Sequence, residues 1–344
     1  MPLTVEWRDG VFIGYRDVEI VFDPQKSTDR CKRIFVTHAH LDHAKASTKI
    51  RAEKVSTRET VDLLSIYKKK VTGWRHVFYK EKVTFDSLEI VAHNAGHVLG
   101  SSLFQVNSPE GTILYTGDFQ FVDSFTLKAA EAVSCDILIL EATFGSPFFV
   151  FPDRRKVASM IVNWANKTLK RGKIPIFKAD SLGNAQEIIK IFNLFSDIQV
   201  IVHPRIAEIN RIYESHGCRL ESLNLNSVEG KKIIASASGV LVAPKAVRQN
   251  GSFRSETALV SGWALCFKRK NASFPLSDHA DFSQLIRFVE ACKPKIVLTC
   301  FGKKFDKILA NQIEKKLRIE ARPLNLIKNE IYLRSKPSYF SVST

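Results

Sequence analysis

The sequence predicts a mixed α/β protein that is built from two structural parts. Strand-like runs separated by turns dominate the first third of the 344 residues, and strands alternate with helices from about Phe149 onward. A helix–strand–helix pattern then follows Pro275. An alternation of strands and helices over ~120 residues is typical of a small α/β domain of its own. A chain of this length has room for two domains, or for one large domain with an insertion.

The first third is expected to consist mainly of strands, because its apolar runs are short and bounded by turn residues. Val11–Tyr15 and Val18–Phe22 form an expected hairpin, and Asp136–Leu140 is apolar enough to be buried on both faces. A helix is expected at Ser56–Lys68, since Ser-Thr-Arg-Glu at its start resembles a capping box. The other expected strands are Arg33–Thr37, Leu88–Ala92, Leu103–Val106 and Thr112–Tyr115.

The rest of the chain alternates between the two element types. Expected helices are Arg154–Arg171, Asn184–Phe195, Ile206–Ser215, Phe282–Cys292 and Phe305–Leu317. Expected strands are Ile174–Lys178, Ile198–Val202, Lys232–Ala235, Ala258–Val260 and Lys295–Thr299. Residues 335–344 are expected to be a loose tail, because terminal residues without apolar contacts are rarely ordered.

The composition excludes several classes of protein. A hydrophobic fraction of 45% and a charged fraction of 25% are those of a globular protein. No apolar run approaches the ~20 residues that cross a bilayer. The first residues do not resemble a signal peptide, and the six cysteines form no Cys-x-x-Cys pair. We therefore expect a cytoplasmic protein, or a nucleoid-associated or nuclear one, without a disulfide framework or contact with a membrane.

The charge indicates a polyanionic partner. Fifty-one Lys and Arg residues against thirty-five Asp and Glu residues give a net charge of +16. Lysines and arginines placed against phosphates release condensed counterions, so such an excess suits nucleic acid, although it also serves solubility alone. The basic residues form short groups: Lys68–Lys70, Arg154–Arg155, Lys231–Lys232, Lys268, Arg269 and Lys270, and Lys303–Lys304.

The strongest chemical signal is the segment His-Ala-His-Leu-Asp-His, directly after the expected strand Arg33–Thr37. It places His38, His40, Asp42 and His43 within six residues. Neutral imidazoles and a carboxylate are ligands that zinc accepts, and a loop after a buried strand can arrange them around a small volume. The segment therefore predicts a metal site.

Two later segments fit as its completion. His97 lies in the glycine-flanked sequence Asn-Ala-Gly-His-Val-Leu-Gly-Ser after an expected strand. Asp118 lies at the end of the expected strand Thr112–Tyr115, in the Thr-Gly-Asp that directly follows it. An aspartate can bridge two ions roughly 3.5–4 Å apart, which is the spacing in two-metal hydrolases.

With these motifs the sequence resembles the metallo-β-lactamase superfamily, whose fold is an αββα sandwich. The resemblance implies that the first metal is held by His38, His40, His97 and Asp118. It implies that the second metal is held by Asp42, His43 and Asp118. Asp23, in Val-Phe-Asp-Pro, matches the family's strand-end aspartate, which orients the histidine loop without binding the metal. An ordinary turn residue before proline is the alternative interpretation of Asp23.

Further segments are similar to the β-CASP nucleases of this superfamily. Leu140–Gly145 carries Glu141 as the acidic residue of one β-CASP motif, and Leu276–Phe282 carries His279 of the histidine motif. Ala179–Glu187 and Val260–Trp263 resemble parts of the β-CASP domain, in the manner of DNA-ligase-associated exonucleases and Artemis/Apollo-type nucleases. The resemblance implies a metallo-β-lactamase domain in two segments, 1–148 and 273–334, around an inserted α/β β-CASP domain, 149–272.

The sequence departs from the RNA-processing β-CASP enzymes at one position. Those enzymes usually carry a further histidine, a ligand of the second metal, where residues 296–303 here read Ile-Val-Leu-Thr-Cys-Phe-Gly-Lys. Alignment on the glycine places Phe301 at that position, and alignment on the threonine places Cys300 there; the first is favoured. A slip of one residue turns a strand side chain to the opposite face, so the choice matters. Artemis-type nucleases also lack this histidine, which implies DNA as substrate and a second zinc held more weakly than the first.

The predicted function is that of a zinc-dependent nuclease, a 5′-exonuclease of DNA repair or processing, and the sequence leaves open whether it also cuts internally. Asp42 would orient the nucleophile, and His279 would protonate the leaving oxygen while Glu141 holds its other ring nitrogen. An RNA-processing nuclease is the main alternative. A small-molecule hydrolase would need neither the insertion nor a charge of +16, and an inactive scaffold would normally have lost metal ligands.

Overall fold

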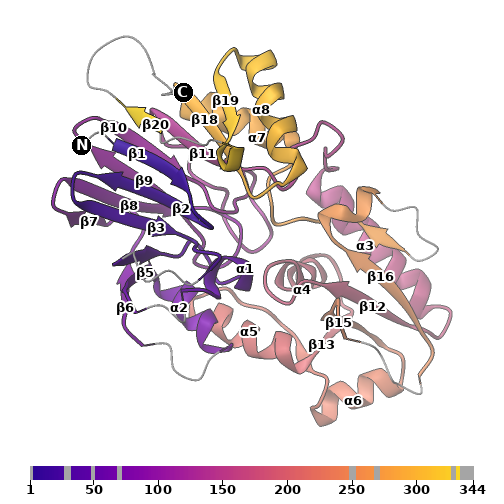
Figure 1. Cartoon of the computed structure of the whole chain (residues 1–344). Coiled ribbons are helices and arrows are strands. Elements are labelled where there is room, and N and C mark those ends of the chain that lie inside the picture. Colours follow the sequence, from indigo (N-terminus) through magenta and orange to yellow (C-terminus); the bar gives the residue numbers. More distant parts are fainter. Residues whose placement is uncertain are drawn as a thin grey trace. The chain divides into compact units, whose positions relative to one another are not determined.

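Two seven-stranded β-sheets lie face to face in the computed structural model of the chain (Figure 1). The structure describes residues 3–26, 32–47, 51–67, 72–247, 253–266, 272–326 and 331–333. The chain folds as two units. Unit 1 comprises Met1–Val122, Lys128–Val150 and His279–Thr344, whereas unit 2 comprises Asp123–Leu127 and Phe151–Asp278.

Both sheets belong to unit 1. The first has the strand order β20-β1-β2-β3-β4-β5-β6, and the second has the order β19-β18-β11-β10-β9-β8-β7. The strands of the first sheet are β1 (Leu3–Trp7), β2 (Val11–Tyr15), β3 (Val18–Phe22), β4 (Arg33–Phe35), β5 (Glu53–Thr57), β6 (Trp74–Val77) and β20 (Ile331–Leu333). Those of the second are β7 (Lys82–Phe85), β8 (Leu88–Asn94), β9 (Ser102–Ser108), β10 (Gly111–Tyr115), β11 (Ile137–Glu141), β18 (Ile296–Cys300) and β19 (Glu320–Pro323).

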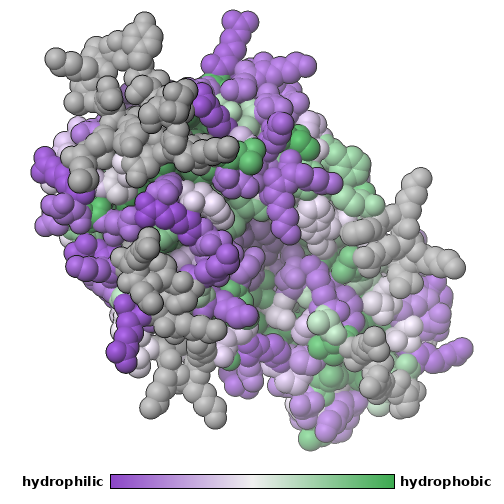
Figure 2. All heavy atoms as spheres, in the orientation of Figure 1, coloured by the Kyte–Doolittle hydropathy of each residue, from purple (hydrophilic) through white to green (hydrophobic). Residues whose placement is uncertain are grey.

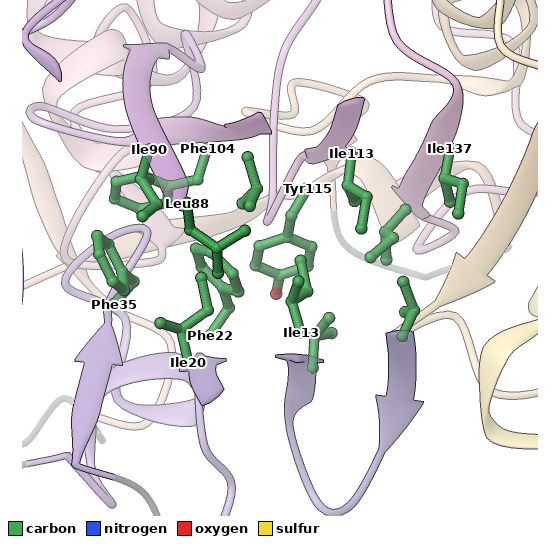
Figure 3. Packing of buried hydrophobic residues seen from close by; sticks show 14 of the residues in the cluster. Ile13, Ile20, Phe22, Phe35, Leu88, Ile90, Phe104, Ile113, Tyr115 and Ile137 are labelled. Carbon is green, nitrogen blue, oxygen red and sulfur yellow. The ribbon is translucent and has the colours of Figure 1, made fainter. Parts of the chain in front are cut away.

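Apolar side chains from the facing sides of the two sheets form the main core (Figure 3). Phe22 of the first sheet lies at its centre, with its ring centroid 5.3 Å from Phe35, 5.5 Å from Phe104 and 5.3 Å from Tyr115. Aromatic pairs at such distances add to the gain from burying apolar area. The hydroxyl of Tyr115 points toward the first sheet, so one polar group enters this core (Figure 3).

Helices cover the outer faces of this sandwich. α7 (Phe282–Cys292) and α8 (Lys304–Leu317) pack on the second sheet through a cluster that includes Leu138, Phe288 and Leu309 (Figure 1). α2 (Arg58–Ser65) packs beside β5 and β6 and buries Val61, Leu63 and Leu64. The short helix α1 (Leu41–Ala44) follows β4. Unit 1 therefore has the αββα layers that the sequence predicts.

Unit 2 contains a parallel six-stranded sheet of order β14-β13-β15-β12-β16-β17. Successive residues of β12 point to opposite faces of this sheet. Ile176 packs with Ile234 of α6, and the ring centroid of Phe177 lies 5.3 Å from that of Trp164 of α3. The strands are β12 (Ile174–Ala179), β13 (Gln199–Val202), β14 (Leu223–Asn224), β15 (Gly239–Pro244), β16 (Ser255–Val260) and β17 (Ser273–Phe274). The helices are α3 (Arg154–Leu169), α4 (Asn184–Phe195), α5 (Pro204–Ser215) and α6 (Val228–Ala235), with 3₁₀ turns at Gly262–Cys266 here and at Leu324–Leu326 in unit 1.

Two local predictions are wrong. The expected strand Lys232–Ala235 is the end of helix α6, which Ser227 caps by accepting a hydrogen bond from the Gly230 amide at 3.0 Å. The neighbouring strand is β15, in the apolar run after Gly239. Helix α2 is capped by Thr57, the last residue of strand β5, rather than by the preceding serine, which lies within that strand.

The predicted tail, 335–344, and the basic group Lys268, Arg269 and Lys270 lie outside the described residues. No helix within the described ranges combines the length and apolarity needed to cross a bilayer. On the face shown in Figure 2, hydrophilic side chains cover most of the area.

Replacement of Phe104 by alanine should destabilise unit 1 strongly. The ring is 1% exposed and packs on two other phenylalanines, so its loss leaves a cavity that costs about 3–5 kcal/mol. Chemical denaturation followed by circular dichroism measures the change. Phe148→Ala is the matched control, because that ring is 61% exposed and its loss should change stability by less than about 0.5 kcal/mol. Equal effects of the two changes would contradict the packing described here.

Candidate metal centre

The histidine motif lies where β4 leaves the core. Helix α1 begins directly after His40, and the amides of His43 and Ala44 donate to the His40 carbonyl at 3.1 and 3.0 Å. This tight turn gathers the imidazoles: the ring centroid of His38 lies 4.9 Å from that of His40 and 4.3 Å from that of His43.

His97 reaches the same place from the turn after β8. Gly96 has a φ of +68°, and a Cβ atom there would lie 2.7 Å from the carbonyl oxygen of Lys128, so the turn requires glycine. The hydroxyl of Ser101 accepts a hydrogen bond from the His97 amide at 3.1 Å. The imidazole is thereby directed at the motif, with Nε2 3.0 Å from Nδ1 of His40.

Asp118 comes from the loop after β10 and faces several imidazoles. The preceding Gly117 has a φ of +50°, and a Cβ atom there would lie 2.7 Å from Cβ of Thr37, so only glycine permits this approach. The distances from Oδ2 of Asp118 to Nε2 atoms are 3.3 Å for His43, 3.5 Å for His38, 3.9 Å for His97 and 3.9 Å for His279.

Four of these residues form a group that fits a metal ion. The ligand atoms of His38, His40, His97 and Asp118 all lie within 4.8 Å of one another. Nε2 of His38 is buried without a hydrogen-bond partner, although a buried polar atom normally has one. Burial, together with the charges of His43 and His97, lowers the pKa of His38, which keeps this imidazole neutral as a ligand must be. Three imidazoles and one carboxylate are a donor set for zinc.

Asp23 lies behind the group and holds His43. Its fully buried carboxylate accepts hydrogen bonds from the amide and the hydroxyl of Thr37 at 2.8 and 2.6 Å, and from the hydroxyl of Tyr115 at 2.9 Å. Nδ1 of His43 lies 2.8 Å from the same carboxylate. Burial lowers the pKa of His43, but the charges of Asp118 and Asp23 outweigh it and raise that pKa well above its usual value. A cation is thus electrostatically favoured at this point.

Glu141 and His279 form a second pair beside the group. The Glu141 carboxylate is buried at the end of β11, accepts a hydrogen bond from the Phe119 amide at 3.0 Å, and lies 3.1 Å from Nδ1 of His279. The His279 carbonyl accepts a hydrogen bond from the Gln120 side chain at 3.0 Å. The other ring nitrogen of His279, Nε2, lies 3.9 Å from Oδ2 of Asp118.

The remaining predicted positions are placed as follows. Asp42 is exposed in α1 and is not one of the four residues whose ligand atoms converge. The ring of Phe301 stacks on that of His43 with centroids 4.8 Å apart and planes at 25°. Sγ of Cys300 instead lies 3.7 Å from the carbonyl oxygen of Leu140, and burial raises the pKa of this thiol well above its usual value.

Three residues that support the site were not found from the sequence. Thr37 and Tyr115 bind Asp23, and Ser101 closes the turn that carries His97. A usable signal existed for the first, because Thr37 directly precedes the histidine motif. Tyr115 occupies an inward-facing strand position that also suits a purely apolar residue, so its hydroxyl becomes meaningful only when the second sheet is in place.

Residues 24–154 match the metallo-β-lactamase superfamily. A probable DNA ligase from Opitutus terrae is 31% identical over 286 residues, which is 79% of this chain. An RNase J-like protein from Methanocaldococcus jannaschii is 27% identical over 58% of this chain, and RNase aCSPSF2 from Saccharolobus solfataricus is 25% identical over 87% of it. The chain spans only 27% of the first relative, 53% of the second and 75% of the third.

A solved structure supports the fold. A protein of unknown function from Enterococcus faecalis V583 superposes on this chain with a TM-score of 0.68, covering 94% of this chain and 98% of that one at 13% sequence identity. Together with the superfamily match, this confirms the predicted fold class.

Asp23→Asn should weaken zinc binding roughly 10- to 100-fold, as loss of a residue that orients a metal ligand typically does. The amide cannot accept all the hydrogen bonds that the carboxylate accepts. A competition titration against a chromogenic chelator measures the affinity. Asp9→Asn is the control, since Asp9 also has a positive φ but is exposed and pairs with Lys26 at 3.1 Å. An unchanged affinity in Asp23→Asn would show that the carboxylate does not support the site.

Proposed function

Because this chain belongs to the metallo-β-lactamase superfamily and its relatives include β-CASP nucleases, we propose that it is a zinc-dependent nuclease that hydrolyses phosphodiester bonds. One observation carries the proposal. The Glu141–His279 pair, 3.1 Å apart, stands beside the four-residue group that fits a metal ion. A metal site alone would serve many hydrolases, whereas a histidine held by a carboxylate adds the acid that a poor leaving group requires.

The chain's own residues would divide the work as follows. His38, His40, His97 and Asp118 would hold the first zinc, which supplies Lewis-acid activation of water near neutral pH. His279 would donate the proton on Nε2 to the leaving oxygen. Glu141 would accept a hydrogen bond from Nδ1 of His279, which fixes the ring and favours its protonated form.

A second, weaker zinc is proposed at Asp42, His43 and Asp118. Its weakness follows from Phe301, whose apolar ring stacks on His43 and offers no donor atom. Asp42 would also orient the attacking water, because a carboxylate accepts a hydrogen bond from it. The exposed position of Asp42 in α1 leaves its side chain accessible for this role.

The proposal extends to DNA as substrate, cut from a 5′ end and also internally. Phe301 supports DNA, because RNA-processing relatives usually carry a histidine at that position, and so does the ligase-named relative that is 31% identical. RNA is the second candidate. The RNase names of several relatives and the match to cleavage and polyadenylation specificity factor subunit 3 of Dictyostelium discoideum, 31% identical over 53% of this chain, favour it.

The first test is cleavage of matched 5′-phosphorylated single-stranded DNA and RNA by the zinc-loaded chain. Asp118→Asn should abolish cleavage, since Asp118 faces both proposed zinc ions, and Asp42→Ala should reduce it. Cleavage of DNA would support the first candidate, and cleavage of RNA alone would support the second. Hydrolysis of thioesters or lactones without cleavage of either polymer would overturn the proposed function.

His279→Ala should slow cleavage roughly 10²- to 10⁴-fold while zinc content stays unchanged, because a general acid contributes to the rate and not to metal binding. Single-turnover cleavage and elemental analysis measure the two quantities. His76→Ala is the matched control, as His76 is an exposed residue of β6. Loss of zinc from His279→Ala would instead identify His279 as a ligand.

Phe301→His should convert the weak second zinc into a tightly held one. The φ of +62° at this position is unusual for phenylalanine but is tolerated better by histidine, and the imidazole would lie beside His43. Zinc content after gel filtration should rise from one ion per chain to two. Cys300→Ala should leave the content unchanged, because its thiol faces a carbonyl oxygen. A fall in zinc content in Cys300→Ala would contradict the assignment of Phe301 to the histidine position.

A further inference from the structure

A small pocket opens in unit 1 next to the metal centre. Its volume is about 200 Å³, and it is lined by Trp7, Gln25, Cys300, Phe301, Lys303, Asp306 and Asn325. The lining comes from the end of β1, the turn after β3, the segment from the end of β18 into the first turn of α8, and the 3₁₀ turn Leu324–Leu326. None of the roles proposed above uses this pocket, apart from the position of Phe301.

Two aromatic rings form a corner of the pocket. Trp7 and Phe301 are both partly exposed, and their rings meet edge to face with centroids 5.3 Å apart and planes at 80°. Phe301 also stacks on His43, which lies 3.3 Å from Asp118. Phe301 therefore lies between the pocket and the metal ligands, so a ligand in the pocket would sit one side chain away from them.

The loop that carries Phe301 is strained and tightly held. Phe301 and Lys303 have φ values of +62° and +56°. The Gly302 amide donates to the buried carboxylate of Asp306 at 2.8 Å, and a Cβ atom at Gly302 would lie 2.3 Å from the carbonyl oxygen of Ala142. Bulky residues keep such conformations only where their surroundings impose them, and these positions cluster at ligand sites.

The lining chemistry selects one class of ligand. Aromatic faces bind the flat face of a nucleobase regardless of its identity. Nε2 of Gln25 donates to the carbonyl oxygens of Asp42 and Asp23, so its side-chain oxygen is the group that can accept from the edge of a base. The exposed Lys303 suits a phosphate. The volume is below the roughly 300–1,000 Å³ of pockets that enclose a drug-sized ligand, so it suits a group no larger than a single base. A strand whose phosphate lies at the metal centre would have a neighbouring base within reach.

We propose that the corner formed by Trp7 and Phe301 stacks one base of a single-stranded nucleic acid next to the bond that is cut, while Lys303 contacts the adjoining phosphate. This inference rests on the proposed nuclease function and adds a binding subsite to it. The subsite would hold the strand in register without reading its sequence.

The test is a scan with oligonucleotides that each carry a single abasic residue, performed on the zinc-free 344-residue chain so that binding is measured without cleavage. One position in the strand should weaken binding about 5- to 150-fold, the range expected for loss of one stacked base. Trp7→Ala should weaken binding of the intact strand by a similar factor and should remove the penalty at that position. Trp7→Phe should retain most of the affinity and the penalty.

Controls separate stacking from structure. Trp74→Ala removes another half-buried tryptophan, at the start of β6, and should leave the scan unchanged. Lys303→Gln should weaken binding equally for all strands and reduce its salt dependence. Should Trp7→Ala fail to fold, the scan of the wild-type chain and of Trp7→Phe still decides. A flat abasic scan, or a penalty that persists in Trp7→Ala, would overturn the subsite.

The abasic scan and the cleavage assay test the subsite and the nuclease function separately. If the zinc-loaded chain cuts nucleic acid but no abasic position depends on Trp7, the subsite is wrong and the nuclease proposal stands. If the chain neither binds nor cuts DNA or RNA, both are wrong.

Discussion

The hydrogen bonds of the buried Asp23 carboxylate are the interaction around which the candidate metal centre is arranged. An ionised carboxylate without partners would cost several kcal/mol to bury. Here Thr37 donates twice, Tyr115 donates once, and Nδ1 of His43 lies 2.8 Å away. Burial, assisted by the negative charge of Asp23, raises the pKa of Tyr115 well above its usual value, so the hydroxyl keeps the proton that it donates. One carboxylate thereby ties the end of β3, the histidine loop and a strand of the opposite sheet together.

From Asp23 a continuous path of polar contacts crosses the site. His43 connects Asp23 with Asp118, and Asp118 faces His279, whose other ring nitrogen contacts Glu141. Burial raises the pKa of Asp118, but the charges of His43 and His279 outweigh it and lower that pKa well below its usual value. The carboxylate is therefore ionised, as binding a cation requires. The same path places His279 beside the group that fits a metal ion, so the candidate ligands and the Glu141–His279 pair belong to one polar network.

The apolar surroundings give this network its precision. Phe22, Phe35, Phe104 and Tyr115 fill the space between the sheets directly beneath the loops that carry the ligands. A close-packed interior resists displacement, so the strand ends that leave it have defined positions. Gly96 and Gly117 then allow the loops to pass so close to neighbouring atoms that any side chain at these positions would clash. Phe301 continues the apolar surface up to His43 and separates the metal ligands from the pocket beside Trp7.

The sequence by itself determined the local features. Four potential ligands within six residues predict a metal site before any fold is known, but only His38 and His40 of these four join the group that fits an ion, and His97 and Asp118 come from elsewhere in the chain. The bounds of Asn184–Phe195 and Phe282–Cys292 were also predictable, since helical periodicity and capping are properties of neighbouring residues. The tertiary structure alone decided which distant residues meet. Glu141 and His279, 138 residues apart, contact each other because β11 and the start of α7 reach the same edge of a sheet. It also decided that the ring of Phe301 stacks on His43 while Sγ of Cys300 lies 3.7 Å from the Leu140 carbonyl oxygen, because β18 ends at Cys300 in register with β11 and the backbone turns to a positive φ at Phe301. The short run Ile-Ile before Ala235 fits a helix or a strand equally, and only packing against the sheet of unit 2 resolved it.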